Sequence, residues 1–203
     1  MSRANIPLSS KNKIYLSIAA LLIIAAGGIF FISAQSVSSP GTLSQNSNST
    51  ELQVRVAALS RATSDQCSYL GDKQAIYASV MSQPNSTYFQ GSCCSPMVFS
   101  HYVQQIGGLK NYSDIAMVPP DPYNVSVGQV KRMLNYYDNI TLNQTQNATF
   151  NEAAPLTQDK SWCCCQCWAW YAHAGLAKYL IKNYNFNVSQ VVTVINLEDC
   201  CGG

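Results

Sequence analysis

Residues 163–184 read CCCQCWAWYAHAGLAKYLIKNY, and this stretch decides the fold of the chain. Four of its first five residues are cysteines. Behind them, large apolar side chains recur at helical spacing, at Trp168, Tyr171, Leu176, Tyr179, Leu180 and Ile181. A stripe of that width predicts a helix with a broad buried face. We expect the helix to run from about Cys163 to Tyr184 and to be the most buried element.

The same pattern occurs a second time earlier in the chain. A shift of 72 residues places Cys93 on Cys165 and His101 on His173, and these are the chain's only two histidines. A fixed offset indicates an internal repeat, here over about 91–138 and 163–201. Each unit predicts an αα-hairpin, in which a cysteine-bearing helix is followed by a second helix opened by Asn-Val-Ser. Ser126 or Ser189 is expected to cap that second helix.

The other segments complete an all-α domain over 52–203. Residues 73–81 (KQAIYASVM) predict a short amphipathic helix. The β-branched run at 191–195 (VVTVI) is assigned to a helix because it falls within the repeat. Residues 139–160 are polar and lack a core-forming pattern, so they predict a glycosylated linker between the two units.

An uncharged run of 21 residues, 14–34, predicts a transmembrane signal-anchor. Basic residues precede it and none follows until Arg55, so the positive-inside rule places residues 1–13 in the cytoplasm and the rest outside. A cleaved signal peptide is the alternative, but its apolar region is usually only about 7–15 residues long. Residues 35–51 predict a flexible Ser/Asn-rich spacer. The expected location is the cell membrane, with an extracytoplasmic C-terminal domain.

Eight Asn-x-Ser/Thr acceptors for N-glycosylation support this orientation, because all of them follow the predicted anchor. A surface rich in Ser and Asn is the alternative explanation. The acceptors are Asn48, Asn85, Asn111, Asn124, Asn139, Asn143, Asn147 and Asn187.

Composition and motifs exclude several function classes. Charged residues make up 11% of the chain and the net charge is +2, which gives no basic surface for nucleic acid. The sequence contains no Gly-rich phosphate loop, Ser-His-Asp order or His-Glu-x-x-His motif, so nothing indicates a hydrolase or a nucleotide-dependent enzyme.

The nine cysteines are clustered, which suggests either dense disulfide bonding or metal chemistry. In an oxidising compartment disulfides are the default, and an odd count leaves at least one thiol free or bridged between molecules. Adjacent cysteines rarely bond to each other, so the 163–167 cluster would pair with the other clusters. The candidates are Cys67, Cys93, Cys94, Cys163, Cys164, Cys165, Cys167, Cys200 and Cys201.

The sharper hypothesis is a site for copper or zinc, because Cys164-Cys165-Gln166-Cys167 holds both C-x-x-C and C-x-C spacings. A position at the N-terminus of a helix would also favour thiolates. His173 lies about 12 Å along the helix from Cys165, so another element must complete a shared site. The predicted ligands are Cys93, Cys94, Cys164, Cys165, Cys167, His101 and His173.

The chain also resembles a family of exported Cys-rich bacterial lipoproteins named for a Pro-Cys-Tyr-Cys-Gly-Cys motif. The resemblance spans Ala75-Ile76-Tyr77, Gln83-Pro84, Ser92-Cys93-Cys94 and Cys164-Cys165-Gln166-Cys167. At the motif itself this chain has Gly-Ser-Cys-Cys-Ser-Pro (91–96), and its anchor carries no cysteine for a lipid. The resemblance implies an exported, Cys-rich helical module and no specific activity.

Three functional hypotheses follow from these features. The first is a membrane-anchored protein that binds a soft metal through clustered thiolates. The second is a disulfide-stapled structural or interaction subunit of a membrane or cell-surface assembly. The third is an exported thiol-disulfide oxidoreductase, for which a C-x-x-C motif usually needs a βαβ context that is not visible here.

Overall fold

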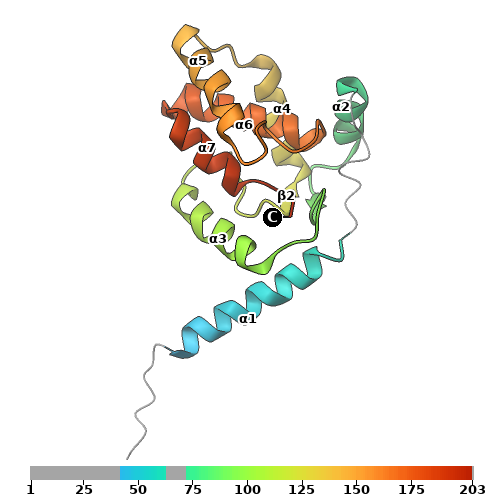
Figure 1. The fold of residues 1–203 in the computed structure, drawn as a ribbon. Coiled ribbons are helices and arrows are strands. Elements are labelled where there is room, and N and C mark those ends of the chain that lie inside the picture. Colours follow the sequence, from blue (N-terminus) through green and yellow to red (C-terminus); the bar gives the residue numbers. More distant parts are fainter. Residues whose placement is uncertain (1–41, 63–71, 203) are drawn as a thin grey trace, which may run out of the picture. The chain divides into compact units, whose positions relative to one another are not determined.

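The computed structural model describes residues 42–62 and 72–202, and this part of the chain is mostly helical, as predicted (Figure 1). Two short strands are the exception, and they were not predicted. In chain order the elements are α1 (Thr42–Leu59), α2 (Lys73–Ser82), β1 (Tyr88–Gln90), α3 (Phe99–Leu109), the 3-10 helix η1 (Lys110–Tyr112), β2 (Asn124–Ser126), α4 (Val127–Asn139), α5 (Gln144–Ala153), the 3-10 helix η2 (Ala154–Leu156), α6 (Trp168–Tyr184) and α7 (Val188–Leu197).

Helix α6 is the centre of the core, which confirms the prediction from its apolar stripe. It packs against α2, α4, α5 and α7, and most of its side chains are buried. Its closest neighbour is α4, which crosses it where α6 has a glycine. A Cβ atom at Gly175 would collide with the backbone of Met133 and Tyr137 in α4. The glycine therefore sets how near the two helices approach.

Helices of one proposed repeat pack against helices of the other. α4, the second helix of the first unit, packs on α6, the first helix of the second unit. α3 and α7 form the complementary pair. Helices α6 and α7 are also in contact, as the predicted hairpin requires. Because α3 packs on α7, the start of the first unit lies close to the end of the second.

One of the two expected helix caps is confirmed. The Oγ of Ser126 accepts a hydrogen bond from the Gln129 amide at 3.2 Å, so it caps α4 as predicted. Ser189 does not cap α7, because that helix begins earlier, at Val188. Asn187 is the N-cap, and it forms a capping box with Gln190.

Three boundaries differ from the predictions. Helix α6 begins at Trp168, so the cysteines from 163 to 167 lie in the loop before it. Helix α5 lies inside the predicted linker 139–160, where the ring of Phe150 packs at a tilt against Trp162 with ring centroids 4.6 Å apart. Helix α1 begins at Thr42, inside the predicted spacer. A helix anchored by packing at Leu52 and Val56 extends outward at little cost, because propagation is easier than nucleation.

The unexpected strands position the first cysteine cluster. β1 and β2 pair antiparallel, with Phe89 opposite Val125. Phe89 also stacks on Trp168, the first residue of α6, with ring centroids 4.5 Å apart. These contacts hold the chain just before Cys93 against the start of α6.

An ion pair joins α1 to the domain. The guanidinium of Arg55 lies 2.9 Å from Asp121, whose carboxylate is 1% exposed. The same carboxylate accepts hydrogen bonds from the Tyr102 hydroxyl and the Tyr123 amide. Three donors satisfy this buried charge, which would otherwise be costly.

The predicted anchor, 14–34, lies outside the described residues. Across 42–62 and 72–202, no helix is both long and apolar enough to cross a bilayer.

Seven of the eight predicted glycosylation acceptors are exposed in the structure. Asn124 is the exception, because it is half-buried in β2 and its Oδ1 accepts a hydrogen bond from Gln90. Asn143 and Asn187 are also N-cap residues, so helix capping alone accounts for an asparagine at these two positions. Glycosylation itself stays a prediction.

We predict that Gly175→Ala destabilises the domain. The added methyl group must push α4 away from α6, which should cost about 3 kcal/mol. For a domain of this size the melting temperature should fall by about 6–12 °C. Gly107→Ala is the matched control, because no atom lies within 4 Å of a Cβ there. That variant should gain about 0.5–1 kcal/mol from helix propensity. Thermal unfolding followed by circular dichroism measures both, and equal melting temperatures would refute the close crossing.

We predict that Asn187→Ala lowers the free energy of unfolding by about 1 kcal/mol, because it removes the N-cap of α7. Asn187→Asp should leave the stability nearly unchanged, since aspartate caps equally well, yet it removes the glycosylation acceptor. Urea unfolding of unglycosylated protein checks this. A large loss in both variants would show that capping is not the role of Asn187.

Candidate metal centre

Three segments converge on one site: 92–95, 163–167 and 199–202. The last of these runs alongside the first. The amides of Cys93, Ser95 and Val98 donate to the carbonyls of Cys200, Cys201 and Gly202 at 3.0–3.1 Å. Gly202 has a φ of +106°, and a Cβ there would collide with Ser95. Backbone contacts therefore bring the first and last of the three cysteine clusters together without help from the sulfur atoms.

The sulfur atoms lie unusually close to one another. The Sγ of Cys164 is 2.8 Å from that of Cys94 and also 2.8 Å from that of Cys201. Cys201 in turn lies 3.6 Å from Cys93 and 3.7 Å from Cys163. These separations exceed the ~2.05 Å of a disulfide bond. Each central sulfur thus has several sulfur neighbours.

Within the described residues, three sets of side chains each place their ligand atoms within 4.8 Å of one another. We call them the outer, middle and inner groups. The outer group is Cys93, Cys94, Cys164 and Cys201; the middle group is Asp159, Cys163, Cys164 and Cys201; the inner group is Cys163, Cys165 and Cys167.

The cluster extends from the surface into the core. Cys94 and Cys164 are exposed, whereas Cys167 is 0% and Cys163 is 3% exposed. Cys167 is the N-cap of α6, so the inner group lies at a helix N-terminus as predicted. The partial positive charge of that terminus favours negatively charged sulfur.

Electrostatics single out Cys163 as the hub of the cluster. Hydrogen bonds from the thiols of Cys167, Cys200, Cys201 and Cys93 hold the pKa of Cys163 well below its usual range. Sharing hydrogen bonds with Cys163 raises the pKa of its neighbours, as at Cys167 and Cys201. Burial raises the pKa of Cys164 to about 12. Cys163 is therefore the sulfur that shares hydrogen bonds with four other cysteines.

The loop that carries Asp159 is fixed by a turn. The Oγ1 of Thr157 accepts a hydrogen bond from the Ser161 amide and donates to the Ser161 carbonyl. Lys160 takes the left-handed conformation needed to close the turn, with φ of 55°. This turn directs Asp159 toward the cysteines, and one carboxylate oxygen lies 3.8 Å from the Sγ of Cys201. Burial, together with the nearby Asp199 and Cys163, raises the pKa of Asp159.

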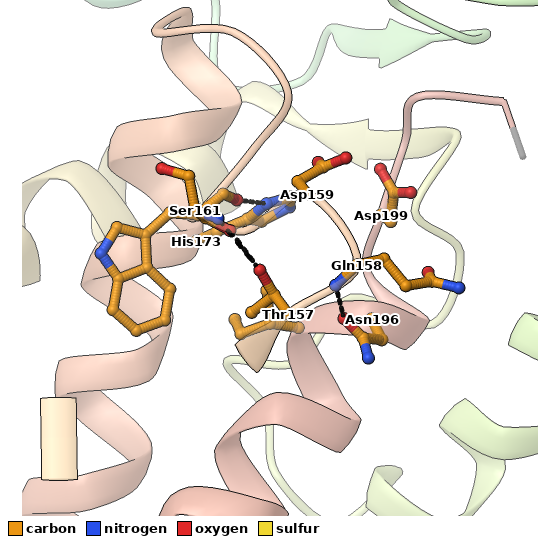
Figure 2. A pocket seen from close by; sticks show the side chains of 9 residues that line it. Thr157, Gln158, Asp159, Ser161, His173, Asn196 and Asp199 are labelled. Atoms are coloured by element: carbon orange, nitrogen blue, oxygen red, sulfur yellow. Dashed lines mark hydrogen bonds between the residues drawn. The ribbon is translucent and has the colours of Figure 1, made fainter. Parts of the chain in front are cut away.

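A small pocket opens beside Asp159, and Figure 2 shows the ring of His173 next to Asp159 with Asp199 across the pocket. Its volume is about 10 Å³, which is room for about one water molecule. The Nδ1 of His173 lies 2.7 Å from the Trp162 carbonyl, an acceptor, so Nδ1 carries the proton. In the neutral ring, Nε2 is then the nitrogen with a free lone pair.

The structure separates the predicted ligands into two sets. The five predicted cysteines all belong to the three groups. Neither histidine belongs to any group within the described residues. His101 lines a second pocket, beside Gln104 and Thr193, and no hydrogen bond between His101 and His173 is found in 72–202. The prediction of histidine ligands in the thiolate site is not supported by this geometry.

Three further residues complete the groups, and the predicted ligand set omitted them: Asp159, Cys163 and Cys201. Cys163 and Cys201 could have been predicted as ligands, because they belong to the cysteine clusters of the sequence. No sequence feature marks Asp159 as a ligand, because a single aspartate in a polar loop is ordinary. Cys67 lies outside the described residues.

Comparison with known proteins identifies no relative. A scan against protein-family models, a search of curated proteins and a search of solved structures each found no match. The resemblance to the Pro-Cys-Tyr-Cys-Gly-Cys lipoproteins therefore stays a prediction. Function has to be argued from the site itself.

We predict that replacing either histidine leaves metal content unchanged. His101→Asn and His173→Asn remove side chains that lie outside all three groups, whereas Cys164→Ser removes a member of two. Elemental analysis of the metal-loaded, reduced variants should show wild-type metal for both histidine variants and less for Cys164→Ser. A deficit in His101→Asn would contradict the assignment.

Proposed function

We propose that this chain is a metal-binding protein that holds Cu(I) or Zn(II) through the thiolates of its convergent cysteine clusters. Soft thiolate ligands select these ions over hard cations such as Mg²⁺ and Ca²⁺. The outer group offers four sulfur atoms from three segments of the chain, the set found in many structural zinc sites.

The observation that carries the proposal is the position of Cys164. Its sulfur is 2.8 Å from two different sulfur atoms, those of Cys94 and Cys201. A disulfide uses one partner, so it would leave the other contact unexplained. A metal ion accepts several sulfur ligands at once, and this matches a sulfur with several neighbours.

Distances within the groups suit a metal ion. Four sulfur atoms around an ion at ~2.3 Å lie about 3.8 Å apart in a tetrahedron. In the outer group the separations of Cys93 from Cys94 and Cys201 are 3.4 and 3.6 Å. The two contacts of Cys164 are shorter, so its side chain would move outward by roughly 1 Å on binding. Cys164 is exposed, which leaves it room to do so.

We further propose that the domain works outside the cytoplasm on a membrane anchor at 14–34. The excess of Lys and Arg before this run supports the orientation. The surface position of seven acceptor asparagines is compatible with glycosylation in that compartment. A metal-binding domain in this place would capture or relay ions at the cell surface.

A disulfide-stapled interaction subunit is the second candidate. An oxidising compartment favours it, and each described cysteine lies close to at least one other cysteine. The exchange-enzyme hypothesis has less support. Its two cysteines, Cys164 and Cys167, share none of the three groups, since Cys164 is in the outer and middle groups and Cys167 is in the inner one.

Cys200 and Cys201 provide a matched test of metal binding. They are adjacent and both are buried, yet Cys201 belongs to two groups and Cys200 to none within the described residues. The full-length chain would be purified reduced and without oxygen, loaded with Cu(I) or Zn(II), and titrated with a competing chelator.

We expect Cys201→Ser to weaken the affinity by more than the roughly 10–100-fold caused by loss of an outer-shell partner. Cys200→Ser should lose no more than that 10–100-fold, because Cys200 contacts Cys93 and Cys163 without belonging to a group. Absence of both metals from the reduced wild-type protein would refute the proposal. Equal losses in the two variants would show that the groups do not define the ligands.

A further inference from the structure

The three groups overlap, and this overlap carries a further inference. Cys164 and Cys201 belong to both the outer and the middle group. Cys163 belongs to both the middle and the inner group. A site for one isolated ion has its own ligands, whereas adjacent sites that share sulfur atoms are joined through them. A thiolate has enough lone pairs to bind two ions at once.

We infer that the centre is polynuclear: it holds at least two Cu(I) ions, joined by bridging thiolates from Cys163, Cys164 and Cys201. This inference rests on the proposed metal-binding function and specifies which metal is bound and how many ions. Each ion forms sulfur bonds as thiol protons leave to solvent. The copper enters and remains as Cu(I), so no electron is transferred.

Charge supports more than one ion. The three groups contain seven cysteines and Asp159, which would carry eight negative charges if all were ionised. Several of these sulfur atoms are buried, where an uncompensated charge is costly. A single ion would engage at most four of these eight side chains, and the sulfur atoms of the other groups would remain neutral thiols. Several ions spread through the cluster would compensate the charge where it arises.

Coordination number favours Cu(I) over Zn(II) across the whole cluster. The inner group supplies only three sulfur atoms, from Cys163, Cys165 and Cys167. Structural zinc sites are almost always four-coordinate, so zinc would lack a ligand there. Cu(I) accepts fewer ligands and prefers soft thiolates. Sharing of Cys163 with the middle group lowers the number of ligands per ion further.

The sites within the cluster are not equivalent. The middle group contains the only oxygen ligand among the three, Asp159, and a carboxylate is a poor ligand for Cu(I). Asp159 also lines the pocket of Figure 2, which has room for about one water molecule. Two of the three members of the inner group, Cys163 and Cys167, are buried. The ion beside Asp159 should therefore exchange first and the inner ion last.

Stoichiometry and metal–metal contact test the inference directly. The full-length chain, reduced and free of oxygen, would be titrated with Cu(I) and followed by native mass spectrometry. X-ray absorption at the copper edge would then be recorded on the loaded protein. We expect at least two copper ions per chain and a copper–copper scattering contribution. One ion per chain without that contribution would overturn the inference and leave the proposed function intact. No bound copper would overturn the inference, and a parallel titration in which zinc also fails to bind would overturn the proposed function.

Variants test the bridges and the order of exchange. Cys163→Ser should cost more than one ion, because Cys163 joins two groups, whereas His101→Asn, outside all three groups, should cost none. In a chelator challenge, copper should leave the wild type in at least two phases. Asp159→Asn should speed the first phase severalfold, and Asp114→Asn, at an exposed position, should not. Release in one phase would refute unequal sites. If Cys163→Ser fails to fold, the absorption spectrum of the wild type still decides the nuclearity.

Discussion

The hydrogen bonds between residues 93–98 and 200–202 are the constraint on which the site depends. They join the start of the first proposed repeat to the end of the second, more than a hundred residues apart in the chain. Since the contacts are made by backbone groups, they do not require a disulfide or a metal. The sulfur atoms are thus brought together by the fold, and binding need not bear the whole entropic cost of ordering three segments.

The same hydrogen bonds depend in turn on the helical core. α7 leads directly into Asp199 and Cys200, and it is held by α3, α5 and α6. α6 is positioned by its close crossing with α4 at Gly175. Small zinc domains unfold without metal because their cores are too small. Here buried residues such as Leu134, Leu176, Leu180 and Val194 form a continuous core, so the scaffold should be folded before the metal binds.

Sequence reasoning succeeded where one periodic pattern decides the outcome. The apolar stripe identified α6 as the most buried helix. The β-branched run at 191–195 was assigned to a helix because of the repeat, and it lies in α7. Prediction from the sequence failed where competing local interactions determine which residue caps a helix. Asn187 rather than Ser189 caps α7, because the capping box with Gln190 satisfies an amide at each end. It also could not find Asp159, whose role arises only when a turn places it beside Cys201.

Crowding of the sulfur atoms limits what oxidation could achieve. In a disulfide framework each cysteine has one partner, and the fold favours that pairing. At this site Cys164 is equally near Cys94 and Cys201, and Cys163 contacts four other cysteines. Oxidation would therefore yield competing pairings rather than one framework. If the domain acts outside the cytoplasm, as proposed, bound metal would protect its thiolates from this outcome, because a coordinated sulfur is a poorer nucleophile toward a disulfide. Loading would then need to precede prolonged exposure to oxidants, which favours a protein that receives its metal during or soon after export.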